Sequence, residues 1–192
     1  NSFNSCKCRN ICSYCLMDTA NLERYLDSFG KYVVQQSRAN LTKGKKNVDK
    51  SLYNSIKFEV ENTPDGFSVK FFMNSYGSFV DKGVSGNKKI QEFVTWDNRK
   101  VASPYNYKSK QPPSGIIEKW IKKRGIKGRD NKTGRFITHK TLSFLIARSI
   151  KLKGTKGISF FQRPLGLGLK KFGAEMLGAV KEDIINSLTT VK

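Results

Sequence analysis

The residues best suited to chemistry in this chain are four cysteines crowded into its first 15 positions. They follow the pattern Cys6-x-Cys8-x3-Cys12-x2-Cys15, and no histidine lies near them. Four thiolates can hold a structural zinc ion, but such sites usually join two pairs of cysteines that are about a dozen or more residues apart. The spacings here are shorter, so the sequence favours free thiols and leaves a zinc site and two disulfides as alternatives.

Other catalytic residue types are sparse. The single histidine, His139, stands at the start of a predicted helix, where a capping or exposed position is the ordinary expectation. A metal-dependent nuclease needs clustered carboxylates, and among the scattered acidic residues only Asp81, Glu92 and Asp97 are candidates to converge. Gly166-Leu-Gly168 follows a proline rather than a strand, unlike a dinucleotide-binding loop. We therefore expect no enzymatic activity and no cofactor.

Net charge is the strongest signal in the composition. The 192 residues include 36 Lys and Arg against 15 Asp and Glu, a formal charge of +21. Such an excess usually serves nucleic acid, an anionic membrane surface or acidic protein partners. The sequence holds no run of about 18 apolar residues and no apolar signal-peptide core. We therefore expect a protein that acts in a cytoplasm or in a particle assembled there.

The basic residues are densest between Lys119 and Arg135. The set that we assign as a candidate DNA-facing or partner-facing patch is Lys122, Lys123, Arg124, Lys127, Arg129, Lys132 and Arg135. Phosphate contacts made by such residues give an affinity that ignores base sequence and falls steeply as salt rises. Trp120 and Phe136 flank the run, but Trp120 is predicted to lie on the apolar face of a helix, which favours a place in the core over base stacking. The sequence has no helix-turn-helix, zinc-finger or RNA-recognition signature, so specific base readout is not indicated.

The apolar periodicity of the first half of the chain predicts a helix and a β-hairpin. These elements do not contain the basic patch. A helix is expected from about Asn21 to Leu41, because apolar residues recur there at helical spacing and Gly30 weakens the pattern without ending it. A β-hairpin follows, with a turn at 63–66 and a second strand over 67–73. Its predicted first strand takes in Tyr53, Ile56, Phe58 and Val60.

Three helices are expected in the second half. The first has Ser114 as its predicted N-cap, ends at Gly125 and has an apolar face of Ile116, Ile117, Trp120 and Ile121. The second runs from about Thr138 to Lys153, with predicted inward residues Leu142, Leu145, Ile146, Ser149 and Ile150 or Leu152. The third covers about 169–188. Segments 87–111 and 154–168 are predicted loops, and the glycines of the second leave it free to rearrange on assembly.

The order of these motifs resembles that of a known family. An aromatic–acidic–glycine segment runs from Tyr76 to Gly86, and Gln111-Pro-Pro-Ser-Gly115 leads into a helix with a Trp-Ile pair. A second helix ends at Gly154, and Gly157-Ile-Ser-Phe-Phe161 precedes the last helix. Over about residues 18–188 this order is similar to the small tail-completion and head–tail joining proteins of tailed bacteriophages. The cysteine-bearing N-terminus and the insertion at 87–111 depart from that family.

The resemblance implies a fold and a function. The fold is α+β, a small antiparallel sheet with an N-terminal helix and C-terminal helices packed on one face. Residues 1–17 are then a flexible extension, and 18–192 form one domain with a polar insertion at 87–111. The function is that of a structural virion protein, assembled in the host cytoplasm, at the head–tail junction or proximal tail end. It forms a hexameric or dodecameric ring, docks on portal, adaptor, neck or tail-tube proteins, touches packaged DNA without reading it and involves no membrane.

Four aromatic residues are the candidate assembly contacts, with core packing as an equal alternative for the last two: Tyr76, Phe79, Phe160 and Phe161. Segments 87–111 and 154–168 are the expected contact loops. The alternative function is sequence-nonspecific nucleic-acid binding, and a toxin or nuclease domain is the third. We also expect that translation begins at Met17, because the composition changes there.

Overall fold

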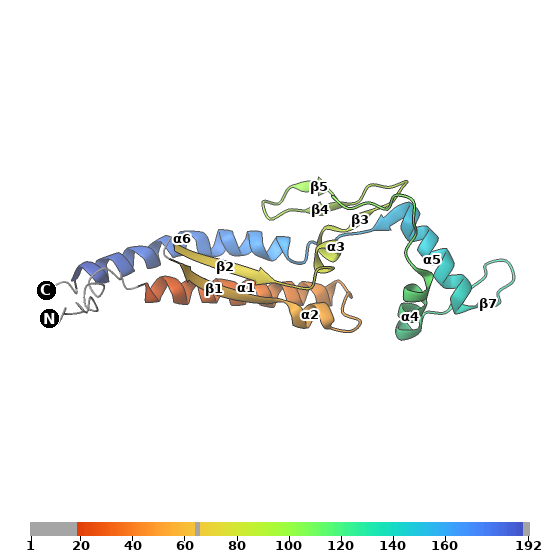
Figure 1. The fold of residues 1–192 in the computed structure, drawn as a ribbon, viewed down its shortest axis with the longest axis horizontal. Coiled ribbons are helices and arrows are strands. Elements are labelled where there is room, and N and C mark those ends of the chain that lie inside the picture. Colours follow the sequence, from red (N-terminus) through yellow and green to blue (C-terminus); the bar gives the residue numbers. More distant parts are fainter. Residues whose placement is uncertain (1–18, 64–65, 190–192) are drawn as a thin grey trace, which may run out of the picture.

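The computed structural model describes residues 19–63 and 66–189, in an elongated arrangement (Figure 1). Two long helices run side by side through one part of the molecule, and a helical lobe forms the opposite end. The predicted α+β class is confirmed, with helices and four two-stranded antiparallel sheets in the described ranges. The cysteine segment, Met17 and the turn residues Pro64 and Asp65 lie outside those ranges.

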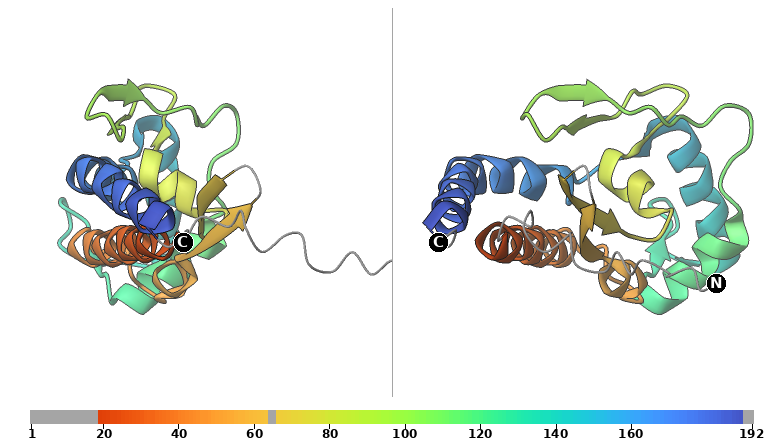
Figure 2. Two further views of the ribbon diagram at one scale, coloured as in Figure 1. Left: turned by 90° about the vertical axis from the view of Figure 1, so that its left-hand side faces the viewer. Right: turned by 60° about the vertical axis from the view of Figure 1, so that its left-hand side comes forward.

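Helices α1 (Ala20–Lys43) and α6 (Gln162–Thr189) form an antiparallel pair, seen end-on in Figure 2. Their interface is aromatic: the Phe172 ring of α6 meets the edges of Tyr25 and Phe29 at centroid distances of 5.6 and 5.8 Å. The expected first helix is thus confirmed, and it continues through Gly30. Burial of one apolar face against a long partner explains why a single glycine does not interrupt it.

Strands β1 (Lys57–Thr63) and β2 (Gly66–Phe72) form the predicted hairpin, which packs on α1. Phe58 stands opposite Phe71, whose ring lies 6.2 Å from Phe29 and 5.4 Å from Phe161. The predicted start of the first strand is wrong, because Tyr53 belongs to the short helix α2 (Ser51–Ser55). Arg38 of α1 donates hydrogen bonds to the carbonyls of Tyr53 and Ile56 and so stabilises this short helix.

A second, smaller core lies in the lobe, which is built from α4 (Ser114–Arg124), β6 (Gly128–Arg129), β7 (Phe136–Ile137) and α5 (His139–Lys153). The main core centres on Val34, Leu41, Leu52, Ile56 and Phe160, whereas the lobe buries Ile117, Ile121 and Ala147. The two sets of buried residues share no member. The lobe therefore has a hydrophobic centre of its own.

Several predictions for the lobe helices need correction. Pro113 rather than Ser114 occupies the N-cap of α4, and Ser114 is its first helical residue. Ile116 and Trp120, expected on the apolar face, are 67% and 39% exposed, and Leu145 and Ser149 of α5 also face solvent. The reason is that α4 and α5 cover only one stripe of each other. The ends were predicted well: Gly125 adopts the left-handed conformation after α4, and the Thr138 hydroxyl caps α5 by accepting from the Thr141 N–H.

The middle of the chain links the two parts through α3 (Gly77–Lys82) and two short strand pairs. β3 (Val84–Ser85) pairs with β8 (Gly154–Thr155), and β4 (Glu92–Val94) pairs with β5 (Lys100–Ala102). The β4–β5 hairpin lies over the start of α6 (Figure 2). The prediction of an irregular excursion at 87–111 is therefore wrong for its central part.

The last helix begins at Gln162, earlier than predicted, so the predicted loop at 154–168 is wrong for residues 162–168, while 156–161 lie outside helices and strands as expected. Pro164 falls in the first helical turn, where its missing N–H has no helical partner to lose. At Gly166 an added Cβ would meet the Trp96 carbonyl oxygen, and at Gly168 it would meet the Phe29 ring at 2.9 Å. These glycines permit close helix packing rather than loop movement.

Candidate functional site

A cluster of catalytic or metal-binding side chains is not found in the described ranges: no three His, Cys, Asp or Glu residues there come together to hold a metal ion. Asp81 is buried in α3, Glu92 is exposed on β4, and Asp97 bonds to Thr95 and Arg99 within its own turn. The carboxylates that the sequence offered as candidates therefore do not converge. His139 is the exposed first residue of α5, as expected.

The buried Asp81 carboxylate accepts a hydrogen bond at the N-terminus of α6. The donor is the Phe161 N–H at 2.9 Å, and the Asp81 carbonyl accepts the Ser159 N–H at 2.9 Å. Burial raises the pKa of Asp81, while the backbone N–H groups of Phe161 and Gln162 oppose that rise by stabilising the anion. The side chain thus serves the open N-terminus of α6 and fastens α3 to it.

Asp183 caps the N-terminus of α1 at the other end of the helix pair. Its buried carboxylate accepts the N–H groups of Leu22 and Asn21 at 2.9 and 3.3 Å. These donors belong to the first turn of α1, where no intrahelical acceptor exists. Each long helix is therefore capped by a carboxylate that lies far away in the sequence.

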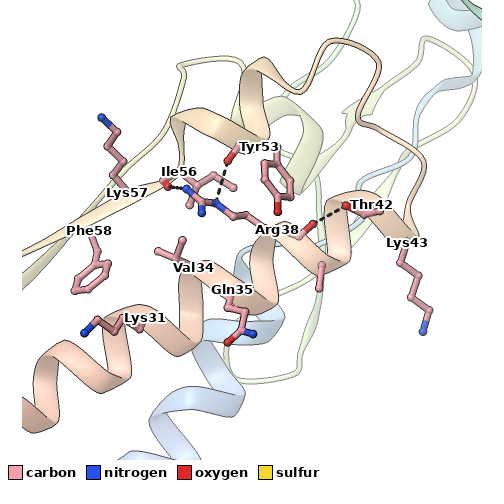
Figure 3. Close-up of a pocket in the computed structure, with 11 residues that line it drawn as sticks. Lys31, Val34, Gln35, Arg38, Thr42, Lys43, Tyr53, Ile56, Lys57 and Phe58 are labelled. Carbon is pink, nitrogen blue, oxygen red and sulfur yellow. Dashed lines mark hydrogen bonds between the residues drawn. The ribbon is translucent and has the colours of Figure 1, made fainter.

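A groove of about 1020 Å³ lies between the second half of α1 and the α2–β1 junction (Figure 3). Its floor includes Val34, Ile56 and Phe58, and Figure 3 shows that Arg38 turns inward from α1. The Arg38 guanidinium donates to the carbonyls of Tyr53 and Ile56 at 3.1 and 2.9 Å. None of the described residues that line this groove is a carboxylate or a histidine, so their arrangement supports packing rather than acid–base chemistry.

The basic lobe, which we define as residues 114–153, concentrates positive charge at one end of the molecule (Figure 1). It carries Glu118 and Asp130 against twelve cations: Lys119, Lys122, Lys123, Arg124, Lys127, Arg129, Lys132, Arg135, Lys140, Arg148, Lys151 and Lys153. The structure brings all seven residues of the predicted patch into this lobe, and each is exposed.

Three side chains of the predicted patch also make an ion pair or hydrogen bond within the chain. Lys122 pairs with Glu118 at 2.9 Å, Lys123 pairs with Asp49 at 2.6 Å, and Arg124 donates to the Lys45 carbonyl. The last two contacts tie the lobe to the loop after α1. Of the other four, Arg129 lies over the Phe136 ring at 4.6 Å.

The predicted patch leaves out five lobe cations, of which Lys140 and Arg148 are the most relevant to this surface. Both are exposed on α5, one turn before and one turn after the exposed Phe144. Residues four apart in a helix lie on one face, so the three side chains form a cation–aromatic–cation row. The i, i+4 spacing was the signal that could have identified them.

The four predicted assembly contacts divide between surface and core. Tyr76 and Phe79 are exposed, and the Phe79 ring stands edge-on to Tyr105 at 4.4 Å beside a groove of about 700 Å³. Phe161 is half-buried against Phe71. Phe160 is fully buried in the main core, so the folded subunit does not present it to a partner.

Among the described residues, both ends of the molecule expose large apolar side chains, and so does the region of the β4–β5 hairpin and the start of α6, at Trp96, Val101 and Leu167. At one end α6 presents Leu177, Ile184 and Leu188, which are 71%, 40% and 71% exposed. At the other end the basic lobe presents Ile116, Trp120 and Phe144. Large exposed apolar side chains grouped on one element mark contact surfaces for other macromolecules.

Comparisons of the chain with family models, curated proteins and solved structures yield no match. None of the helices in the described ranges has the length and apolar character needed to cross a bilayer.

Proposed function

We propose that this protein is a structural subunit of a tailed-phage particle, which assembles with its own copies into a ring at the head–tail junction or the proximal tail end. The observation that supports this most directly is the pair of exposed apolar faces at opposite ends of an elongated subunit. The family resemblance of the motif order supports it as well.

The position of these faces bears on the type of assembly. Two different faces that bind one another make a heterologous contact, which closes into a ring when the rotation between copies permits. A two-fold dimer would instead use the same face on both copies. The basic lobe would then line the ring lumen, where it meets DNA phosphates without base readout, or face acidic neighbours in the neck.

The first experiment is the mass of the purified protein by light scattering, with electron micrographs of the same fraction. Nuclease treatment in about 1 M salt removes bound nucleic acid, and the sample then returns to about 0.15 M before measurement. Closed rings of uniform size support the proposal. A monomer that binds DNA fragments tightly at the lower salt instead supports the second candidate.

That second candidate is sequence-nonspecific nucleic-acid binding, favoured by the crowding of exposed cations on the basic lobe. Affinity for a DNA fragment should then fall linearly on a log–log plot against salt, with a slope of about −0.9 for each phosphate contacted. Replacing Lys132 and Arg135 with alanine should make the slope shallower by about 2. An unchanged slope would exclude these two residues from the binding surface.

A further inference from the structure

The β6–β7 hairpin of the basic lobe presents an aromatic ring to solvent. Phe136 is 63% exposed and stands opposite Arg129 in the antiparallel pair. The guanidinium carbon of Arg129 lies 4.6 Å from the centroid of the Phe136 ring. This cation–π contact orients the ring before any ligand arrives. Figure 1 shows β7 and the turn that precedes it at the extremity of the lobe, where a large partner can reach them.

The two faces of this hairpin have different surroundings. Residues that pair across an antiparallel ladder point to the same face, and neighbours along a strand point to opposite faces. Gly128 and Ile137 form the inner pair, because a Cβ on Gly128 would lie 3.0 Å from Cδ1 of Leu142 on α5. The Arg129–Phe136 pair therefore faces away from α5. The side of the exposed ring that Arg129 leaves uncovered is open to a ligand.

The charge around this ring is strongly positive. Between positions 127 and 137 the single acidic residue is Asp130, whose carboxylate accepts the Lys132 N–H at 3.0 Å and the Thr133 hydroxyl at 3.1 Å within the turn. The same segment carries four exposed cations: Lys127, Arg129, Lys132 and Arg135. The ion pairs between described residues use none of these four. A ligand that meets the ring is therefore expected to be an anion.

We infer that this hairpin is a binding site for single-stranded nucleic acid, in which an unpaired base stacks on the open face of Phe136 and the neighbouring cations contact its phosphates. A nucleotide combines a planar π-face with an adjacent anion, and so matches the ring and the cations together. Bases inside a duplex already have neighbours on both faces, so the ring selects a single strand. Every base has a π-face, so the site needs no base-specific hydrogen bonds. This inference rests on the nucleic-acid-binding candidate and names its substrate class.

The test is Phe136→Ala in the full chain. Fluorescence anisotropy measures binding to a labelled oligothymidylate and to a labelled duplex of the same length, at about 0.15 M salt. The variant should lose at least about fivefold in affinity for the single strand, because stacking on one aromatic side chain is worth at least that factor. Its affinity for the duplex should be unchanged. The salt dependence should also be unchanged, since no cation has been removed.

A second variant gives a direct signal of stacking. Phe136→Trp keeps an aromatic face and should bind the single strand at least as tightly as the wild type does. Oligothymidylate should quench the fluorescence of this added indole beyond any quenching of the two native tryptophans, which the wild type measures. This readout tests the site even if Phe136→Ala is poorly folded, which far-UV circular dichroism would reveal.

The matched control is Phe72→Ala. Phe72 is 45% exposed and also stands opposite a cation, Lys57, in an antiparallel hairpin, but it lies outside the basic lobe. This variant should bind both DNAs as the wild type does. Equal losses in Phe72→Ala and Phe136→Ala would show that the lobe hairpin has no special role, and would overturn the inference.

The other outcomes separate this site from the proposed functions. If the wild type binds both DNAs, but Phe136→Ala loses nothing and the added indole is not quenched, the stacking site is wrong while nonspecific binding stands. An equal loss on the single strand and the duplex overturns the selection of a single strand. A wild type that binds neither DNA overturns the nucleic-acid candidate and the site together. Loss of self-assembly in Phe136→Ala with unchanged DNA affinity would assign the ring to a protein contact instead.

Discussion

Replacing Gly30 with alanine perturbs the closest approach between α1 and the β1–β2 hairpin. A Cβ at this position would lie 2.2 Å from Cδ2 and 2.4 Å from Cε2 of Phe58. Carbon atoms pack best at about 3.5–4.0 Å, so the ring must retreat by at least about 1.3 Å. Phe71 stands on the hairpin beside it, with its ring centroid 6.4 Å away, and limits that retreat.

Two opposing terms set the magnitude. Alanine is the better helix former by about 1 kcal/mol, whereas forcing extra volume into a packed core costs about 1–3 kcal/mol. The short approach puts the cost near the upper end, so we expect Gly30→Ala to lower the free energy of unfolding by about 1–2 kcal/mol. The sequence alone suggests the opposite sign, because it shows only a glycine within a helix.

Gly173→Ala is the matched control in α6. An added Cβ there meets no atom within 4 Å, so the propensity gain stands alone and should stabilise the protein by about 0.5–1 kcal/mol. Urea unfolding followed by circular dichroism gives both values, provided that the slope m is unchanged. A Gly30→Ala variant as stable as the wild type would refute the packing of Phe58 on α1.

Three further predictions concern the caps and the β4–β5 hairpin. The pKa of Asp81 is raised above its ordinary value of 3.8, so the stability that its protonated form contributes is present below that pH and is lost as pH rises through the folded-state pKa. The free energy of unfolding of the wild type relative to Asp81→Asn should therefore fall as pH increases above 3.8 in a series of urea titrations, and a rise would contradict the assigned burial. Asp183→Ala should cost about 1–2 kcal/mol and speed amide exchange at Leu22, because the cap of α1 is lost; unchanged exchange there would argue against this cap. Gly166→Ala should detach the hairpin, since its Cβ would overlap the Trp96 carbonyl, and limited proteolysis should then cut within 92–102. Protection equal to that of the wild type would show that the hairpin does not rest on α6.

Features with local causes could be predicted from the sequence. Apolar spacing marked α1 and α5, Gly125 and Gly154 marked helix ends, and the alternation after Gly66 marked β2. The density of cations between Lys119 and Arg135 identified the basic lobe, because these residues lie within a few turns of one another on adjacent elements. Local propensity and short-range contacts are sufficient for such features.

Which faces are covered depends on contacts between elements that are distant in the sequence. Arg38 holds Tyr53 in a helix that its β-type pattern does not predict, and the Trp96 carbonyl requires the glycine at Gly166. Phe160 lies in the core while Trp120 is exposed, because burial depends on which elements meet. The cap of α1 shows the same limit most clearly: the Asp183 carboxylate accepts the Leu22 N–H although 161 positions separate the two residues in the sequence. No local pattern encodes a contact between residues so far apart in the chain.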